Sequence, residues 1–87
     1  MVENLENLIV QEESEIETKK KEIDRKVGEK VKILCVVENT TRKKLAEVMG
    51  ISETSMINKC GGKTPFTMSE LVLISEFFGK SIDELLK

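Results

Sequence analysis

Residues 41–58 read TRKKLAEVMGISETSMIN, a pattern typical of two short helices joined by a tight turn. Thr41 is suited to cap the first helix, and Gly50 is suited to the positive φ that ends it. Ser52 follows the turn and is suited to cap a second helix, which we expect over residues 53–60. The spacing is that of a helix-turn-helix unit.

The same stretch predicts how the two helices meet. Leu45 and Met56 should face each other in the core, and Ala46 is small where the helices cross. We expect Ile51 to pack into the core beneath the turn and hold the turn in place. The two helices and their turn therefore form one packed unit.

Further along the chain, capping residues again mark where helices begin and end. Thr67 followed by Glu70 forms a capping box for a helix that runs through Phe78, with Gly79 as its terminator. Residues 81–84 repeat the box. No segment alternates apolar and polar residues as a strand does, so the predicted fold is all-α.

Upstream, residues 3–27 contain neither Gly nor Pro and predict an N-terminal helix. Residues 1–18 carry six Glu and no Lys or Arg, whereas residues 19–32 carry seven basic and three acidic residues. Such an order suits the helix macrodipole, so one solvated helix would explain it. The alternative starts from apolar residues seven apart, which would pack on the rest of the chain or pair with a second chain. These residues are Val2, Ile9, Ile16 and Ile23, beside a companion row that is polar at Glu12, Lys19 and Lys26.

Gly28 is expected to break this helix and to start another, from about Val27 to Asn39. The second helix is apolar nearly all round, because Ile33, Cys35 and Val36 add to its main apolar face. A helix without a polar face must be covered on more than one side. We expect the N-terminal helix to cover it.

Composition restricts the function. Eighty-seven residues suffice for one small domain, and a net charge of −2 requires any nucleic-acid contact to come from a local patch. The chain has no His, so we predict no enzymatic activity, no metal and no cofactor. Cys35 and Cys60 are interpreted as reduced, apolar residues of a cytoplasmic protein. No apolar run approaches the roughly 20 residues of a membrane span.

The stretch TRKKLAEVMGISETSMINKCGGKTPFT resembles the Cro/repressor-type helix-turn-helix family, also called XRE or lambda-repressor-like. The resemblance extends over residues 27–86 and implies a five-helix domain at residues 27–87, preceded by a helical extension at residues 1–26. It implies a sequence-specific, double-stranded DNA-binding regulator, a dimeric repressor of the phage or mobile-element type found in Gram-positive bacteria. The dimer would form through the C-terminal helices, although the N-terminal extension could supply that contact instead.

The resemblance also implies which residues touch DNA. Base contacts fall in the second helix of the pair, where Asn can bond adenine, Thr can meet a thymine methyl and Glu can accept from cytosine. These positions are Glu53, Thr54, Ile57 and Asn58.

Contacts to the DNA backbone are implied around them. They are Arg42, Lys43, Lys44, Ser52, Ser55, Lys59 and Lys63. Lys59 departs from the family, which often carries an apolar or aromatic core residue there, and Cys60 could fill that space.

A rival hypothesis keeps the scaffold but changes its use. The chain would then be a non-catalytic protein-binding module, such as an antitoxin or an anti-regulator, holding a protein partner through its N-terminal helix. Neutral charge in residues 33–87 and the acidic Glu53 favour this alternative. Charge reversal of the basic residues would abolish DNA binding but leave partner binding unchanged.

Overall fold

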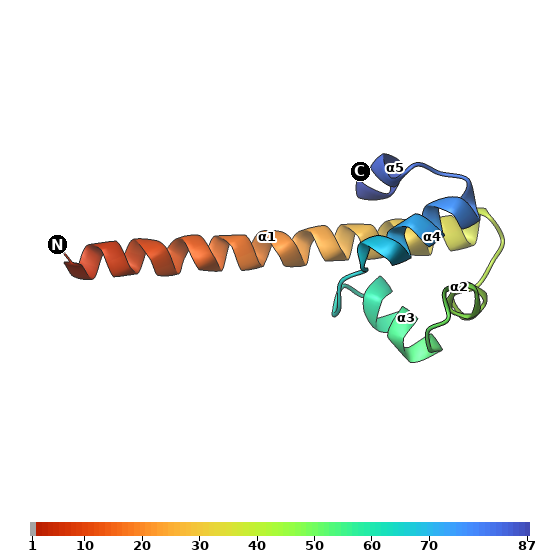
Figure 1. Cartoon of the computed structure of the whole chain (residues 1–87), viewed down its shortest axis with the longest axis horizontal. Coiled ribbons are helices and arrows are strands. Elements are labelled where there is room, and N and C mark those ends of the chain that lie inside the picture. The colour runs from red at the N-terminus through yellow and green to blue at the C-terminus, as the bar shows by residue number, and fades with distance from the viewer. Residues whose placement is uncertain (1) are drawn as a thin grey trace.

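The computed structural model describes the backbone of residues 2–87 and the side chains of residues 15–87. It contains α1 (Val2–Val37), α2 (Arg42–Met49), α3 (Glu53–Cys60), α4 (Met68–Phe78) and α5 (Ile82–Leu86). No strand occurs within residues 2–87, so the all-α prediction is confirmed. Figure 1 shows α1 as a long rod, with the four shorter helices gathered around its C-terminal part.

α1 is one continuous helix of 36 residues, so the predicted break at Gly28 is wrong. Residues 2–87 form five helices rather than five plus a separate N-terminal one. Gly28 is needed for another reason. A Cβ at this position would overlap the carbonyl oxygen of Cys60 and would lie 2.9 Å from that of Lys59. Glycine therefore lets the end of α3 lie directly against α1, at the modest cost of a helical glycine.

The uninterrupted helix also overturns the expectation that the N-terminal segment covers the apolar residues after Gly28. Ile33, Val36 and Val37 are 57%, 81% and 68% exposed. A straight helix cannot fold back over its own C-terminal part. Val27 is the first buried residue among the described side chains, and none of residues 15–26 is buried. The predicted apolar positions Val2 and Ile9, with Glu12 beside them, lie outside the described side chains.

The core lies where α1 meets the four short helices. Val31, Leu45, Met56, Ile74 and Leu85 each have no exposed surface. They come from all five helices, one from each. The predicted partners Leu45 and Met56 are thus both at the centre, and Ile51 packs against the core from the turn as expected.

The caps agree closely with prediction. The side chains of Thr41, Ser52, Thr67 and Ser81 each accept a hydrogen bond from the backbone N–H three residues later. Both predicted capping boxes form. Because a cap needs partners only three residues away, local sequence suffices to define these helix starts.

Both cysteines are buried in the core and neither forms a disulfide. Burial raises the pKa of both thiols, and Cys35 also raises that of Cys60. The thiols are therefore protonated at neutral pH and act as small apolar side chains, as predicted. None of the described helices is both long and apolar enough to cross a membrane.

Candidate nucleic-acid interface

The turn between α2 and α3 sets the angle at which the two helices present their outer faces. Gly50 ends α2 with φ of 70°, and the N–H of Ile51 donates to the carbonyl of Ala46 over 3.0 Å. Ser52 then starts α3 by accepting a hydrogen bond of 3.0 Å from the N–H of Ser55. These bonds satisfy backbone groups at both helix ends, so the turn is short and well defined.

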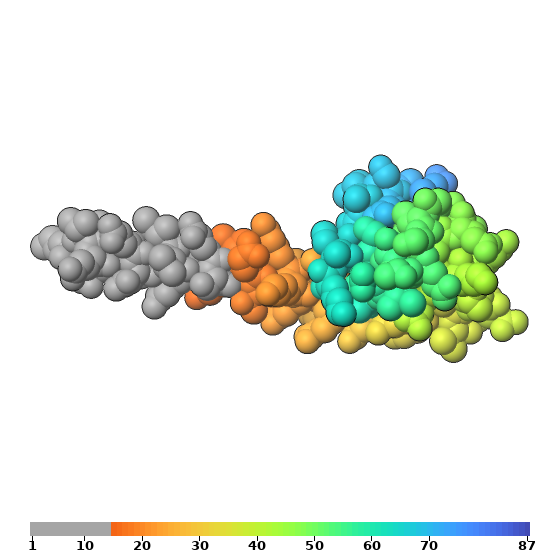
Figure 2. All heavy atoms as spheres, turned by 90° about the horizontal axis from the view of Figure 1, so that it is seen from below, coloured from red at the N-terminus to blue at the C-terminus, as the bar shows by residue number. Residues whose placement is uncertain are grey.

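The inner faces of α2 and α3 are buried in the core. Leu45, Ala46 and Met49 of α2 are buried against Met56 and Cys60 of α3. Ala46 is 2% exposed, which fits its predicted place at the crossing of the helices. Figure 2 shows the outer surfaces of both helices side by side on one face of the molecule. That face is available for another molecule.

The four predicted base-contact residues share the outer side of α3. Glu53, Thr54 and Ile57 are exposed, Ile57 by 45%, and Asn58 is half-buried. Spacings of one and four residues bring them onto one helical face. Ile57 is exposed, as a base contact requires. The group offers an amide, a hydroxyl, a carboxylate and an apolar tip, which are the kinds of group that read base edges.

Arg42, Lys43 and Lys44 occupy the first turn of α2, and all three are exposed. No acidic residue accompanies them there, although the N-terminus of a helix carries partial positive charge and favours anions. The first turns of the other short helices each contain at least one acidic residue. α2 therefore begins with a concentration of positive charge that its own chain does not neutralise in that turn.

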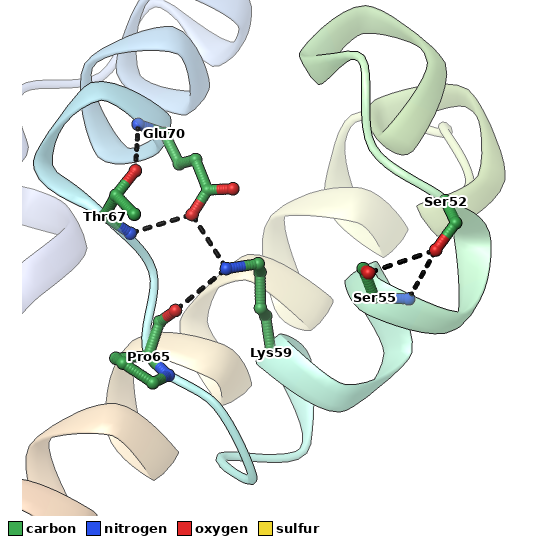
Figure 3. A network of polar contacts seen from close by, with 6 residues as sticks. All are labelled: Ser52, Ser55, Lys59, Pro65, Thr67 and Glu70. Carbon is green, nitrogen blue, oxygen red and sulfur yellow. Dashed lines mark hydrogen bonds and ion pairs between the residues drawn. The ribbon is translucent and has the colours of Figure 1, made fainter.

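Ser52 and Ser55 form a closed pair at the start of α3. The hydroxyl of Ser52 accepts from the Ser55 N–H and donates to the Ser55 Oγ, each over 3.0 Å (Figure 3). Ser52 is exposed and Ser55 is half-buried. The pair presents hydroxyl groups beside the exposed face of α3.

Lys59 is held inside the protein instead of projecting outward from α3. Its Nζ donates to the Pro65 carbonyl and to Glu70 Oε1, each over 2.9 Å, and its side chain is only 14% exposed (Figure 3). The same Nζ lies 5.9 Å from the ring centre of Phe66. Lys59 thus ties α3 to the start of α4 and shares with Cys60 the space that an apolar residue would fill. The Lys59 ammonium group, which was predicted to contact phosphate, is therefore paired with the Glu70 carboxylate.

Glu70 also forms hydrogen bonds at the start of α4, where Lys59 meets it. Its carboxylate also accepts the Thr67 N–H over 2.8 Å, while its own N–H donates to the Thr67 hydroxyl over 3.2 Å. Partial burial alone would raise the pKa of the Glu70 carboxyl. The hydrogen bonds from Thr67 and Lys59, with the lysine's charge, outweigh burial and hold that pKa below its usual value.

Lys63 is exposed in the loop after α3, and the structure brings it to a basic part of α1. The loop approaches so closely that a Cβ on Gly62 would lie 3.0 Å from the Cα of Arg25. An open groove of about 740 Å³ results, with Lys20, Lys21 and Arg25 on its α1 side and Lys63 on the loop side. Glu17, Glu22 and Asp24 also line it, so its net charge is only slightly positive.

Lys20, Lys21 and Arg25 were not predicted as site residues. The signal was present in the basic run at residues 19–32, but its position beside the loop depends on α1 remaining one helix through Gly28. No family model, curated protein or solved structure matches the chain. Within the described side chains, no group of three or more Cys, Asp or Glu could hold a metal ion.

Proposed function

We propose that the protein is a sequence-specific, double-stranded DNA-binding regulator, with α2 and α3 forming a Cro/repressor-type helix-turn-helix. In this proposal α3 enters the major groove and the first turn of α2 meets the DNA backbone. The regulator is a repressor of the phage or mobile-element type, as its sequence resemblance implies.

One observation carries the proposal: an uncompensated basic helix start lies beside a helix face able to read bases. Arg42, Lys43 and Lys44 add to the positive end of α2, which makes a phosphate the natural partner of that turn. The neighbouring exposed residues of α3 have the chemistry of direct readout. Phosphate contacts position the protein, and base contacts supply the specificity.

The basic residues of the groove between α1 and the loop after α3 extend the surface for phosphate contact. Lys63 matches a backbone-contact position of the family, and Lys20, Lys21 and Arg25 lie across the groove from it. Ser52 and Ser55 add hydroxyl groups at the start of α3. Lys59 is left out of the contact surface, because releasing it would break the ion pair with Glu70.

The test is selection from random duplex DNA, followed by affinity measurements from 50 to 200 mM salt. We expect the wild-type protein to enrich an inverted repeat, since one recognition helix reads too few base pairs for useful affinity. Asn58→Ala should lose about 1–3 kcal/mol of discrimination at one position of each half-site.

The double variant Lys43→Ala, Lys44→Ala should keep the sequence preference but bind more weakly, with the salt dependence reduced by about two phosphate contacts. Ser69→Ala, Glu76→Gln changes two exposed residues of α4 and serves as the control, with an unchanged salt dependence. Failure to enrich any sequence, with only weak salt-sensitive binding, would contradict the proposal.

A second candidate, a protein-binding module, is favoured by a separate observation. Ile33, Val36 and Val37 expose apolar surface on the last turns of α1. A protein that selected no DNA sequence but required these three residues to hold a partner would have this function instead.

A further inference from the structure

One face of α1 carries a row of exposed residues that its own chain leaves uncovered. We call this row the α1 stripe: Ile16, Lys19, Ile23, Lys26, Ile33 and Val37. The spacings of three, four and seven residues keep the row on one side of the helix, as in a coiled-coil seam. Its four apolar members are 52% to 68% exposed. The stripe runs from the part of α1 beyond the compact core to the part beside α5.

Beside α5, the stripe borders an open groove of about 340 Å³. Ile33 and Val37 form its apolar wall, and Lys30, Lys80 and Lys87 surround it, with Glu84 as the one acidic residue. The groove therefore favours an occupant that is helical, partly apolar and acidic.

The chain itself contains such a segment. Residues 1–18 carry six Glu and no basic residue, and Val2, Leu5 and Ile9 continue the spacing of the stripe. This segment cannot reach the groove of its own molecule, because it belongs to the same continuous helix. It can reach the groove of a second copy.

We propose that two copies of the chain associate through antiparallel α1 helices, with the acidic segment of each lying along the basic half of the α1 stripe of the other. The midpoint of the pairing lies near residue 18, where acidic sequence gives way to basic. Ile16 and Ile23 flank that midpoint and pack across it. Ile33, Val37 and the lysines of the groove receive the first turns of the partner helix.

Charge order selects the antiparallel direction. In a parallel pair, six Glu of one copy would lie against six Glu of the other, and the basic halves would face each other. In an antiparallel pair each acidic half meets a basic half, and complementary charges of this kind set the orientation of helix pairs. The lysines of the α1 stripe supply charge at the seam while the isoleucines supply buried area.

The pairing is independent of the proposed DNA contacts. None of the residues of the α1 stripe lines the groove that holds Lys20, Lys21, Arg25 and Lys63. A dimer would therefore form without DNA, and its failure would leave the DNA proposal to be decided by its own test.

The first experiment measures the mass of the full chain by sedimentation equilibrium, without DNA, at tens of micromolar protein. We expect a dimer. The double variant Ile16→Glu, Ile23→Glu should associate more weakly by more than about a hundredfold, because it places like charges at the centre of the seam.

The matched control is Val48→Glu, Met68→Glu, which changes two exposed apolar residues outside α1 (44% and 66% exposed). Its association should stay within about threefold of wild type. Circular dichroism checks that both variants stay folded. A wild-type chain that remains monomeric, or a control as weak as the α1 variant, would overturn the proposal.

A second experiment tests the direction. Lys19→Glu, Lys26→Glu makes both charged residues of the α1 stripe acidic, and Glu6→Lys, Glu13→Lys reduces the side-chain charge of residues 1–18 from −6 to −2. Each variant alone should dimerise at least about tenfold more weakly than wild type at low salt, and an equal mixture of the two should recover dimers.

Fluorescence energy transfer then separates the two orientations. A donor on Glu3→Cys of one copy and an acceptor on Glu29→Cys of another should lie close together only in the antiparallel pair. In a parallel pair the labelled residues would be about 40 Å apart along the helix. Cys35 and Cys60 are buried, so labelling of the folded protein goes to the introduced thiols. Strong transfer between two copies both labelled at residue 3 would overturn the antiparallel arrangement.

Discussion

Residues 15–26 and residues 27–37 belong to the same helix, but different interactions hold them. The first segment has no buried side chain, and its support comes from spacing: Glu15, Glu17 and Glu22 each precede a lysine by four residues. Such pairs contribute only about 0.2–0.5 kcal/mol each. The second segment buries Val27, Val31, Leu34 and Cys35 against the other helices. Helical sequence alone is thus enough to continue α1, whereas packing determines where the compact part begins.

The largest effect should come from the point where the compact part begins. Gly28→Val adds a branched side chain where a Cβ already overlaps the Cys60 carbonyl, and backbone cannot give way as a flexible side chain can. We expect a loss of about 3 kcal/mol or more in the free energy of unfolding, measured by urea denaturation.

The control for this change is Glu29→Val, which adds the same side chain one residue later at an exposed position outside the α1 stripe. It should cost about 1 kcal/mol or less. Equal losses for the two variants would mean that helix propensity, and not the contact with α3, explains the glycine.

A smaller effect should follow from the corner between α3 and α4. Glu70→Gln removes the charge that Lys59 and the Thr67 N–H share, and we expect it to cost about 1–3 kcal/mol. Gln retains a hydrogen-bond acceptor, so the loss should fall in the lower part of that range. Glu76→Gln, an exposed change on the same helix, should be nearly neutral.

The same pair predicts a dependence on pH. The folded protein holds the pKa of Glu70 below its unfolded value, so the folded state binds its proton less readily than the unfolded state. The stabilisation is complete above the ordinary glutamate pKa of about 4.3 and is lost as the pH falls through the lower pKa of the folded protein. Glu70→Gln should flatten the fall in stability over that acid range. An unchanged pH profile would show that the pair contributes nothing.

The smallest effect should come from removing most of the projecting part of α1. A chain lacking residues 1–22 keeps every buried residue of the described core. At protein concentrations too low for association, its melting temperature should stay within about 4 °C of the full chain. Aggregation or a large loss of stability would mean that the N-terminal segment protects Ile33, Val36 and Val37 within the monomer.

Much of the fold could be predicted because its signals are local. Thr41, Ser52, Thr67 and Ser81 act as caps through bonds that reach only three residues, and Gly50 ends α2 through its own backbone angle. The exposure of Ile57 follows from the periodicity of α3 once Met56 and Cys60 are assigned to the core. The outer face of the α2 and α3 pair was predictable for the same reason.

The sequence was less informative where a residue's partner is distant in sequence. Lys59 looked like a free cation on an exposed helix, but Glu70 lies 11 residues further on and captures it. The loop at Gly62 approaches α1, and only this contact brings the candidate site next to Lys20, Lys21 and Arg25. Neither outcome is encoded in the local pattern around these residues.

Gly28 separates most clearly what sequence determined from what tertiary structure decided. The sequence determined the helical character of the chain, the caps, the core faces and the reversal of charge along α1, because each depends on nearby residues or on composition. A glycine within a helical stretch is compatible with a break or with a close contact. In the folded protein the Cys60 carbonyl of α3 packs directly against Gly28, so the glycine serves a close contact and α1 continues without a break. The α1 stripe is therefore left exposed.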